Sequence, residues 1–316
     1  MQMVRNILIA GIVFLGALGG FGPGRTAEVS SATDGQSEPL PVQWKHLAYR
    51  GSHFLGEATT EVSLAQVPAA EVQKQLISVP KGSPLEASTC AVMVIDVQSR
   101  VDPLFGADDR TGSRAWFSSD NAAALQRIRS RHGNDIWQNT YRFARSGVYR
   151  IRKKPARAAE KQLAPAHWTK IKESFFPFPA VGPESKIVLE PTGLLYLAAN
   201  LAARSPTAPR RLYVFDRKQL HEVTVQVDGR QRLKVNYVER GPREEVKRSG
   251  KTDAVRISFK PRALAQPGEP AEEFSFMGLK GDFEIYIDPA SRLPLEVSGQ
   301  IARIGKIHVR LQTVEF

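Results

Sequence analysis

Residues 221–227 read His-Glu-Val-Thr-Val-Gln-Val, and this stretch decides the fold class. Its three valines alternate with polar residues, which is the period-two pattern of a half-buried β-strand. The dipeptide Asp-Gly at 228–229 is a signal for a hairpin turn. We therefore expect residues 233–238 to return as the antiparallel partner of this strand.

The same β signal recurs along most of the chain. Residues 42–49 and 57–64 predict a hairpin around a turn at 50–52, and the continuous apolar run at 88–101 predicts a strand covered on both faces. Loop-forming residues mark 102–112, and prolines mark 153–179 as an irregular connection. Further strands are predicted at 115–117, 135–152, 211–215, 254–260, 273–277, 281–288, 295–301 and 306–314. The expected fold is mainly β, either a curved antiparallel sheet or a partly open β-barrel.

One helix is predicted, at about 193–204. Pro191 stands near its start, leucines and alanines fill its body, and Pro206 follows its end. The segment is apolar almost all round, so we expect the helix to be buried. Residues 122–131 are ambiguous between a short helix that stops at Gly133 and a strand.

The N-terminal residues 1–24 have the pattern of a signal peptide. Arg5 precedes an uncharged apolar run with small residues at its exit. The run is close to the ~20 residues that span a bilayer, so an uncleaved anchor in the inner membrane is the alternative. We expect a flexible leader at 25–41, a single mainly-β domain at 42–316, and a periplasmic or secreted location in a Gram-negative envelope.

The formal charge of the chain is +12. A basic protein is attracted to anionic lipid headgroups, lipopolysaccharide and acidic glycans. Nucleic acid is not an expected partner of an exported protein. The single cysteine, Cys90, lies in an apolar run, so we expect a buried thiol and no internal disulfide.

Three stretches of the sequence carry a family resemblance. The first runs from Trp116-Phe117 through Gly133 to Tyr141-Arg142-Phe143; the others are Glu190 to Tyr196, and Ile285 to Pro294 followed by Gly305-Lys306-Ile307. In this order they resemble a family of exported proteobacterial proteins that form a domain-of-unknown-function group. The resemblance implies a curved sheet and favours a strand at 122–131. The family has no assigned activity, so it implies no site residues.

No catalytic motif, metal site or cofactor site is predicted. The six histidines lack the spacing of metal ligands, and no Gly-x-Ser-x-Gly elbow is present. Asp282, Glu284 and Asp288 share one face of a predicted strand. Such carboxylates serve glycoside hydrolysis only if they face a sugar cleft, and otherwise they keep the face solvated.

Two sets of residues are candidates for binding. Aromatic side chains on neighbouring predicted strands are either core residues or the lining of an apolar groove: Trp116, Trp137, Tyr141 and Phe143. A basic run is either a phosphate-binding patch or a solvated loop, with the loop favoured: Arg150, Arg152, Lys153, Lys154 and Arg157.

These features lead to three functional hypotheses. The first is a non-catalytic binding or carrier-type protein for a hydrophobic or lipid-like ligand. The second is a structural or interaction module that uses a basic surface against an anionic component of the envelope. The third is a hydrolase that depends on carboxylates.

Overall fold

The computed structural model describes residues 42–53, 56–87, 91–103, 109–133, 135–179, 187–203, 208–265, 268–301 and 305–316. The predicted signal peptide, the whole of the predicted leader and Cys90 lie outside the described residues.

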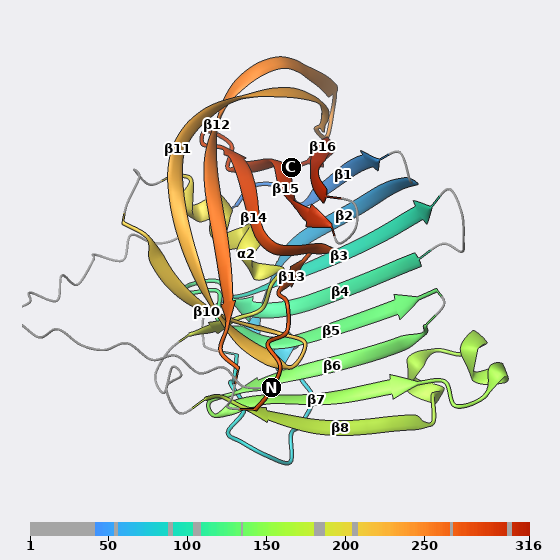
Figure 1. Cartoon of the computed structure of the whole chain (residues 1–316). Coiled ribbons are helices and arrows are strands. Elements are labelled where there is room, and N and C mark those ends of the chain that lie inside the picture. Colours follow the sequence, from blue (N-terminus) through green and yellow to red (C-terminus); the bar gives the residue numbers. More distant parts are fainter. Residues whose placement is uncertain are drawn as a thin grey trace, which may run out of the picture. The chain divides into compact units, whose positions relative to one another are not determined.

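The described part of the chain forms one sheet of sixteen strands (Figure 1). The first eight are β1 (His46–His53), β2 (Gly56–Val67), β3 (Val92–Pro103), β4 (Asp109–Ser118), β5 (Ala124–His132), β6 (Trp137–Ala144), β7 (Gly147–Lys154) and β8 (Lys170–Pro177). The others are β9 (Val188–Leu189), β10 (Arg210–Asp216), β11 (Gln219–Arg240), β12 (Glu245–Ala263), β13 (Ser275–Phe276), β14 (Leu279–Asp288), β15 (Leu293–Ile301) and β16 (Gly305–Glu315).

The strand order joins the two ends of the described chain. From β1 to β8 every strand pairs with the next one in antiparallel fashion, and β1 also pairs with β16. From β16 the sheet continues through β15, β14, β12, β11 and β10 to β9, and β13 pairs with β14. Pairing of sequence neighbours is the usual way in which antiparallel strands connect.

Part of this sheet closes on itself. The end of β11 pairs in parallel with β16 through residues 238–240 and 313–315. Together with the ladders β16–β15, β15–β14, β14–β12 and β12–β11, this pairing makes a closed ring of five strands, whereas β1 to β8 remain open. The prediction of a mainly β fold with a partly open barrel is confirmed.

The predicted hairpin turn at Asp228-Gly229 is wrong. β11 runs without a turn for 22 residues, and its register with β12 shifts between Val227 and Gly229. Gly229 has a φ of +99°, a conformation that glycine adopts at little cost. The Asp-Gly pair therefore forms a β-bulge, which uses the same local chemistry as a turn. The chain reverses at 241–244 instead, where the Gly241 N–H donates to the Glu244 carbonyl.

Other boundaries also differ from the prediction. The predicted loop at 102–112 includes the start of β4, and the predicted turn at 50–52 lies inside β1. The predicted strand at 135–152 is a hairpin of β6 and β7, and the predicted irregular segment at 153–179 contains β8. The ambiguous segment at 122–131 is a strand, β5, as the family resemblance implied. Short polar strands give weak signals because only one of their faces packs on other chain segments.

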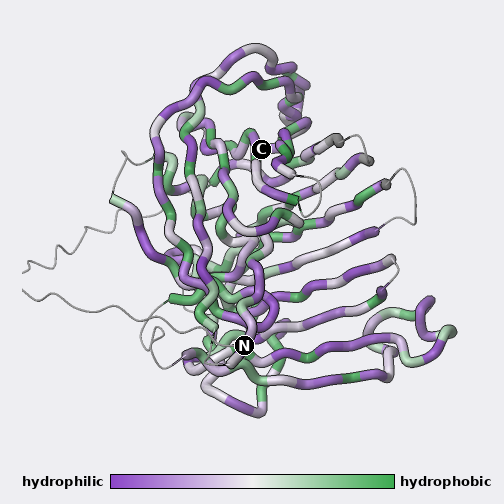
Figure 2. Tube along the Cα trace, in the orientation of Figure 1, coloured by the Kyte–Doolittle hydropathy of each residue, from purple (hydrophilic) through white to green (hydrophobic). Residues whose placement is uncertain are grey.

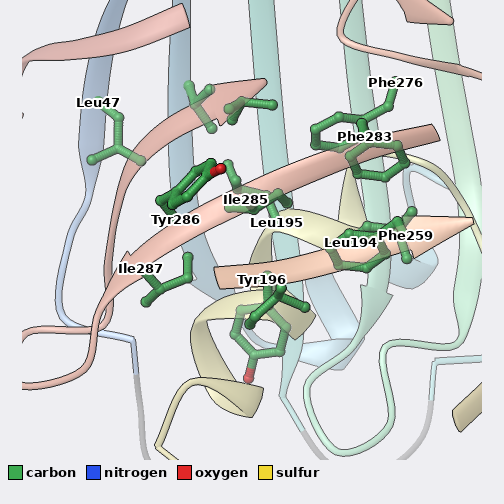
Figure 3. Packing of buried hydrophobic residues seen from close by; sticks show 14 of the residues in the cluster. Leu47, Leu194, Leu195, Tyr196, Phe259, Phe276, Phe283, Ile285, Tyr286 and Ile287 are labelled. Atoms are coloured by element: carbon green, nitrogen blue, oxygen red, sulfur yellow. The ribbon is translucent and has the colours of Figure 1, made fainter. Parts of the chain in front are cut away.

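The predicted buried helix is confirmed as α2 (Gly193–Leu201). Leu194 and Leu195 are at most 1% exposed, and they pack in the main core with Phe259 and Ile285 (Figure 3). Burying a leucine side chain of this kind stabilises the fold by about 1.5–3 kcal/mol. The helix thus packs between the two halves of the sheet path, because it contacts β14 and β15 on one side and the ring of its Tyr196 lies 5.3 Å from that of Phe117 in β4.

Three shorter helical segments complete the description: α1 (Ala69–Gln73) and the 3₁₀ helices η1 (Ala158–Gln162) and η2 (Pro165–His167). Within the described ranges, no helix has the length and apolar character that crossing a bilayer requires.

Gly147 is required where β7 begins beside β8. A Cβ there would meet the carbonyl oxygen of Phe176 and would lie 2.8 Å from Phe175 Cζ and 2.9 Å from Pro177 Cα. Because two of these atoms are backbone, we expect Gly147→Ala to lower the free energy of unfolding by about 2–3 kcal/mol in urea denaturation. Gly241→Ala is the control, since its Cβ would lie 3.4 Å from the nearest atom. A change of equal size in both variants would contradict the steric explanation.

Candidate functional site

A groove of about 640 Å³ lies on one face of β5, β6 and β7. Its opposite wall comes from the β10–β11 turn, the segment before β13, and the β13–β14 turn. The lining residues are Asp109, Thr111, Arg129, Arg131, Trp137, Asn139, Tyr141, Arg150, Arg152, Arg217, Lys218, Glu272, Ser275, Gly278 and Lys280.

The register of the sheet places the polar side chains of this groove in rows. Asn139 of β6 pairs with Arg129 of β5 on one side and with Arg152 of β7 on the other. In the next row, Tyr141 pairs with Arg127 and Arg150. Directly paired residues of antiparallel strands lie on the same face, so these rows stand together above one surface. Figure 2 shows hydrophilic residues along much of β5 to β8.

The groove carries an excess of positive charge. Seven basic and two acidic residues line it, which is a formal excess of five positive charges. Asp109 forms a two-pronged pair with Arg131, with N–O distances of 2.9 and 2.6 Å, and Glu272 pairs with Lys218 at 2.9 Å. The two acidic lining residues thus pair with Arg131 and Lys218. Two carboxylates outside the lining also come near groove arginines, because Asp216 lies 3.6 Å from Arg129 and Asp135 lies 3.9 Å from Arg152.

Two arginines at the centre of the groove are incompletely partnered. Arg150 is 7% exposed, and among the described residues its Nε has no hydrogen-bond acceptor. Its Nη2 donates to Ser174 Oγ at a long 3.4 Å, and its guanidinium lies 4.8 Å from the ring of Phe176. The Nε of Arg152 is likewise buried without an acceptor among the described residues, although its Nη2 lies 3.9 Å from Asp135 Oδ2. Buried donors of this kind normally find a partner, because an unmade hydrogen bond costs free energy.

Trp137 and Lys280 add to the electrostatics of the groove. The Trp137 ring centre lies 5.8 Å from Cζ of Arg129 and 5.9 Å from Cζ of Arg152. This places both guanidiniums within the range of cation–π attraction. Burial, with the guanidinium of Arg217, lowers the pKa of Lys280. The pKa falls because the surroundings of Lys280 are already dry and positive.

A buried ionic network underlies the groove. Arg127 lies 3.4 Å from Glu190 and 3.4 Å from Asp216, and all three are at most 5% exposed. Asp216 is also 3.6 Å from both Arg129 and Arg217, which line the groove. Burial lowers the pKa of Arg127, while the two carboxylates oppose that effect. The network therefore anchors groove arginines to the interior.

The structure divides the four predicted aromatic residues. Trp137 and Tyr141 line the groove. Phe143 lies on the same strand and does not line the groove, and it is buried with Phe215 in a cluster that also contains Tyr141. Trp116 packs in a different cluster, and its indole N–H donates to Gln75 Oε1 at 3.2 Å. The four side chains therefore do not line one common groove.

The predicted basic run is divided as well. Arg150 and Arg152 line the groove, and they lie on strand β7, whereas the sequence favours a solvated loop for this run. Lys154 pairs with Asp135 at 2.7 Å. Lys153 pairs across the sheet with Gln138 and so points to the other face, and Arg157 follows the strand. Sequence reasoning missed the groove residues Arg129, Arg131, Arg217, Lys218 and Lys280.

The predicted carboxylate set is divided, because Asp282 and Glu284 line a hollow of about 180 Å³ beside Lys306 and Asp288 does not. Glu284 lies 3.0 Å from Lys306 and 3.8 Å from Arg256, and it accepts a hydrogen bond from Ser298. Asp288 accepts hydrogen bonds from Ser291 in the following turn, and Asp282 is exposed. None of the three lines the basic groove. Across the described segments, no group of three or more His, Cys, Asp or Glu side chains could hold a metal ion.

Comparison with solved structures shows a likeness in fold. No family model matches the sequence, and no curated protein matches it. A crystal structure from Brucella abortus, described as a β-barrel-like protein of domain of unknown function DUF1849, is similar over 88% of this chain and 98% of that chain. The sequence identity is 10% and the TM-score is 0.44. Like the group that the three sequence motifs resemble, it is a proteobacterial protein of unknown function that is rich in β-structure.

Proposed function

We propose that this chain is a non-catalytic binding protein of the bacterial envelope, and that its basic groove holds an anionic ligand. The location rests on the signal-peptide pattern of residues 1–24. The ligand's charge follows from the lining, where five positive charges remain after the acidic residues are counted. Such a surface attracts anions and raises their local concentration.

The proposal rests on the unpartnered guanidinium nitrogen of Arg150. Its side chain is almost fully buried, lines the groove, and has an Nε without an acceptor among the described residues. Burying a guanidinium costs free energy unless a hydrogen-bond acceptor or a negative charge pairs with it. An oxyanion in the groove supplies the missing acceptor. Because arginine offers several donors in a fixed plane, phosphate or carboxylate groups fit it best.

The character of the groove selects between the hypotheses drawn from the sequence. A purely hydrophobic ligand would leave the groove arginines without acceptors, whereas an anionic ligand pairs with them. The second hypothesis, recognition of an anionic component of the envelope, agrees with the lining. Of the predicted aromatic residues, Trp137 and Tyr141 stay in the proposal because they line this groove.

The proposal predicts a charge-dependent and salt-dependent affinity. Glucose 1,6-bisphosphate is expected to bind the purified protein, and uncharged glucose is expected not to bind, in isothermal titration calorimetry at low salt. Raising the ionic strength from 20 to 200 mM is expected to weaken binding by roughly three- to ten-fold, because added ions screen the charges that attract the ligand. Equal binding of both sugars, or an affinity that salt leaves unchanged, would count against an anion site.

A further inference from the structure

We infer that the ligand of the basic groove is a hydroxyl-rich anion, a saccharide that carries two acidic groups, and that Asn139 selects for its hydroxyls. This inference rests on the proposed anion-binding function. It concerns the part of the ligand that lies between the charged groups, which an anion site alone does not specify.

Asn139 presents an acceptor at the centre of the groove. The residue is 6% exposed, and no described residue donates a hydrogen bond to its Oδ1. Phosphate and carboxylate groups in their ionised form have only acceptor atoms, so they cannot satisfy a carbonyl oxygen. The ligand must therefore bring a donor as well as negative charge, and a hydroxyl group is a neutral donor of suitable size.

The arginines on either side of Asn139 set the spacing of the charges. Arg129 and Arg152 are the direct cross-strand partners of Asn139, on β5 and β7. Two strand spacings separate their backbones, which is about 10 Å. The ring of Trp137 is near both guanidiniums and holds them in place. A ligand with one acidic group at each arginine thus spans the row and carries its neutral portion over Asn139.

The remaining neutral partners of the groove agree with a polyhydroxylated ligand. Thr111, Tyr141 and Ser275 line the same hollow as Asn139. Each of their hydroxyls can both donate and accept a hydrogen bond. An alkyl chain over these groups would leave them without hydrogen-bond partners. A site that recognises hydroxyls binds such a ligand much more weakly. The lining therefore favours a sugar ring over a lipid chain between the two acidic groups.

Two bisphosphates of matched charge test whether the groove prefers a sugar ring or an alkyl chain between the acidic groups. Glucose 1,6-bisphosphate and hexane-1,6-diyl bisphosphate both carry two phosphates at the ends of a six-carbon unit, but only the first has ring hydroxyls. In calorimetric titrations of the full chain at low salt, we expect the sugar bisphosphate to bind about ten-fold more tightly, the effect of one or two neutral hydrogen bonds.

Asn139→Leu, which is similar in size and lacks the acceptor, is expected to reduce this ratio to near one. Thr140→Val is the matched control, because Thr140 pairs with Ile128 and Ile151 on the other face of β6 and should keep the ratio. Asn139→Ser is a second variant in case the leucine variant does not fold, and it is expected to lower the ratio in the same direction.

The outcomes distinguish this inference from the proposed function. If the wild-type protein binds both bisphosphates equally, or the alkyl compound more tightly, the saccharide inference is overturned while anion binding stands; tighter binding of the alkyl compound would point to a lipid-like anion. If Asn139→Leu keeps the full preference, Asn139 is not the selecting residue. If neither bisphosphate binds, the proposed function itself fails.

Discussion

Replacing Glu190 by alanine is expected to lower the free energy of unfolding by about 4 kcal/mol, because the substitution removes one of the two buried carboxylates that pair with Arg127 and leaves several buried donors without an acceptor. Glu190 is fully buried and lies 3.4 Å from Arg127. It also accepts hydrogen bonds from the N–H groups of Thr192 and Gly193 and from the Thr192 hydroxyl, at the start of α2. The alanine variant would leave all these donors without an acceptor in a dry site.

Urea denaturation followed by circular dichroism measures this effect. Glu190→Gln is expected to be less damaging than Glu190→Ala, because it keeps an oxygen acceptor for the helix start and loses only the charge. The control is Glu245→Ala, since the Glu245 side chain is 65% exposed in its pair with Arg240. Exposed pairs of this kind contribute between 0 and about 1 kcal/mol. A loss in Glu190→Ala no larger than in Glu245→Ala would contradict the structural role of the buried carboxylate.

The double substitution Arg150→Gln with Arg152→Gln is expected to weaken the binding of glucose 1,6-bisphosphate by about 100-fold. Both guanidiniums line the groove, and each has a buried Nε without an acceptor among the described residues. A charge-assisted hydrogen bond to an anion contributes about 1.5–3 kcal/mol, so losing two such partners corresponds to a change of this order. Glutamine keeps part of the side-chain length and removes the charge.

The matched control removes the same charge elsewhere. Lys247→Gln with Lys251→Gln changes two exposed residues of β12 that do not line the groove. Calorimetry should show less than a three-fold change in affinity for this control, the effect of a reduced net charge at a distance. If both double variants lose affinity equally, the ligand responds to the overall charge of the protein and not to the groove.

The strand content and the buried helix could be predicted because their signals are local. The alternation of Val223, Val225 and Val227 predicted β11, and all three residues are buried on one face. The apolar segment from Leu194 predicted α2 in the same way. Asp228-Gly229 misled the prediction because a turn and a bulge place the same demand on the backbone at glycine. Long-range pairing between β11 and β12 decided between them.

The candidate site was only half visible. The sequence predicts a basic set that includes Arg150 and Arg152. It predicts a separate aromatic set that includes Trp137 and Tyr141, and it does not indicate that the two sets share one groove. The alternation of Arg127, Arg129 and Arg131 would have shown a basic strand face, but the segment was ambiguous between helix and strand. Arg217 and Lys280 carried no local signal, since a single basic residue in a turn or at the start of a strand is normally solvated.

The sequence by itself determined that this chain forms β-strands with one buried helix, because periods of side-chain polarity depend only on neighbours along the chain. The tertiary structure alone decided that the chain has a basic groove. Strand register places Asn139 between Arg129 and Arg152, and the network around Asp216 draws in Arg217 from the β10–β11 turn. These residues are brought together by hydrogen bonding between strands and by burial of the core, which no local stretch of sequence encodes.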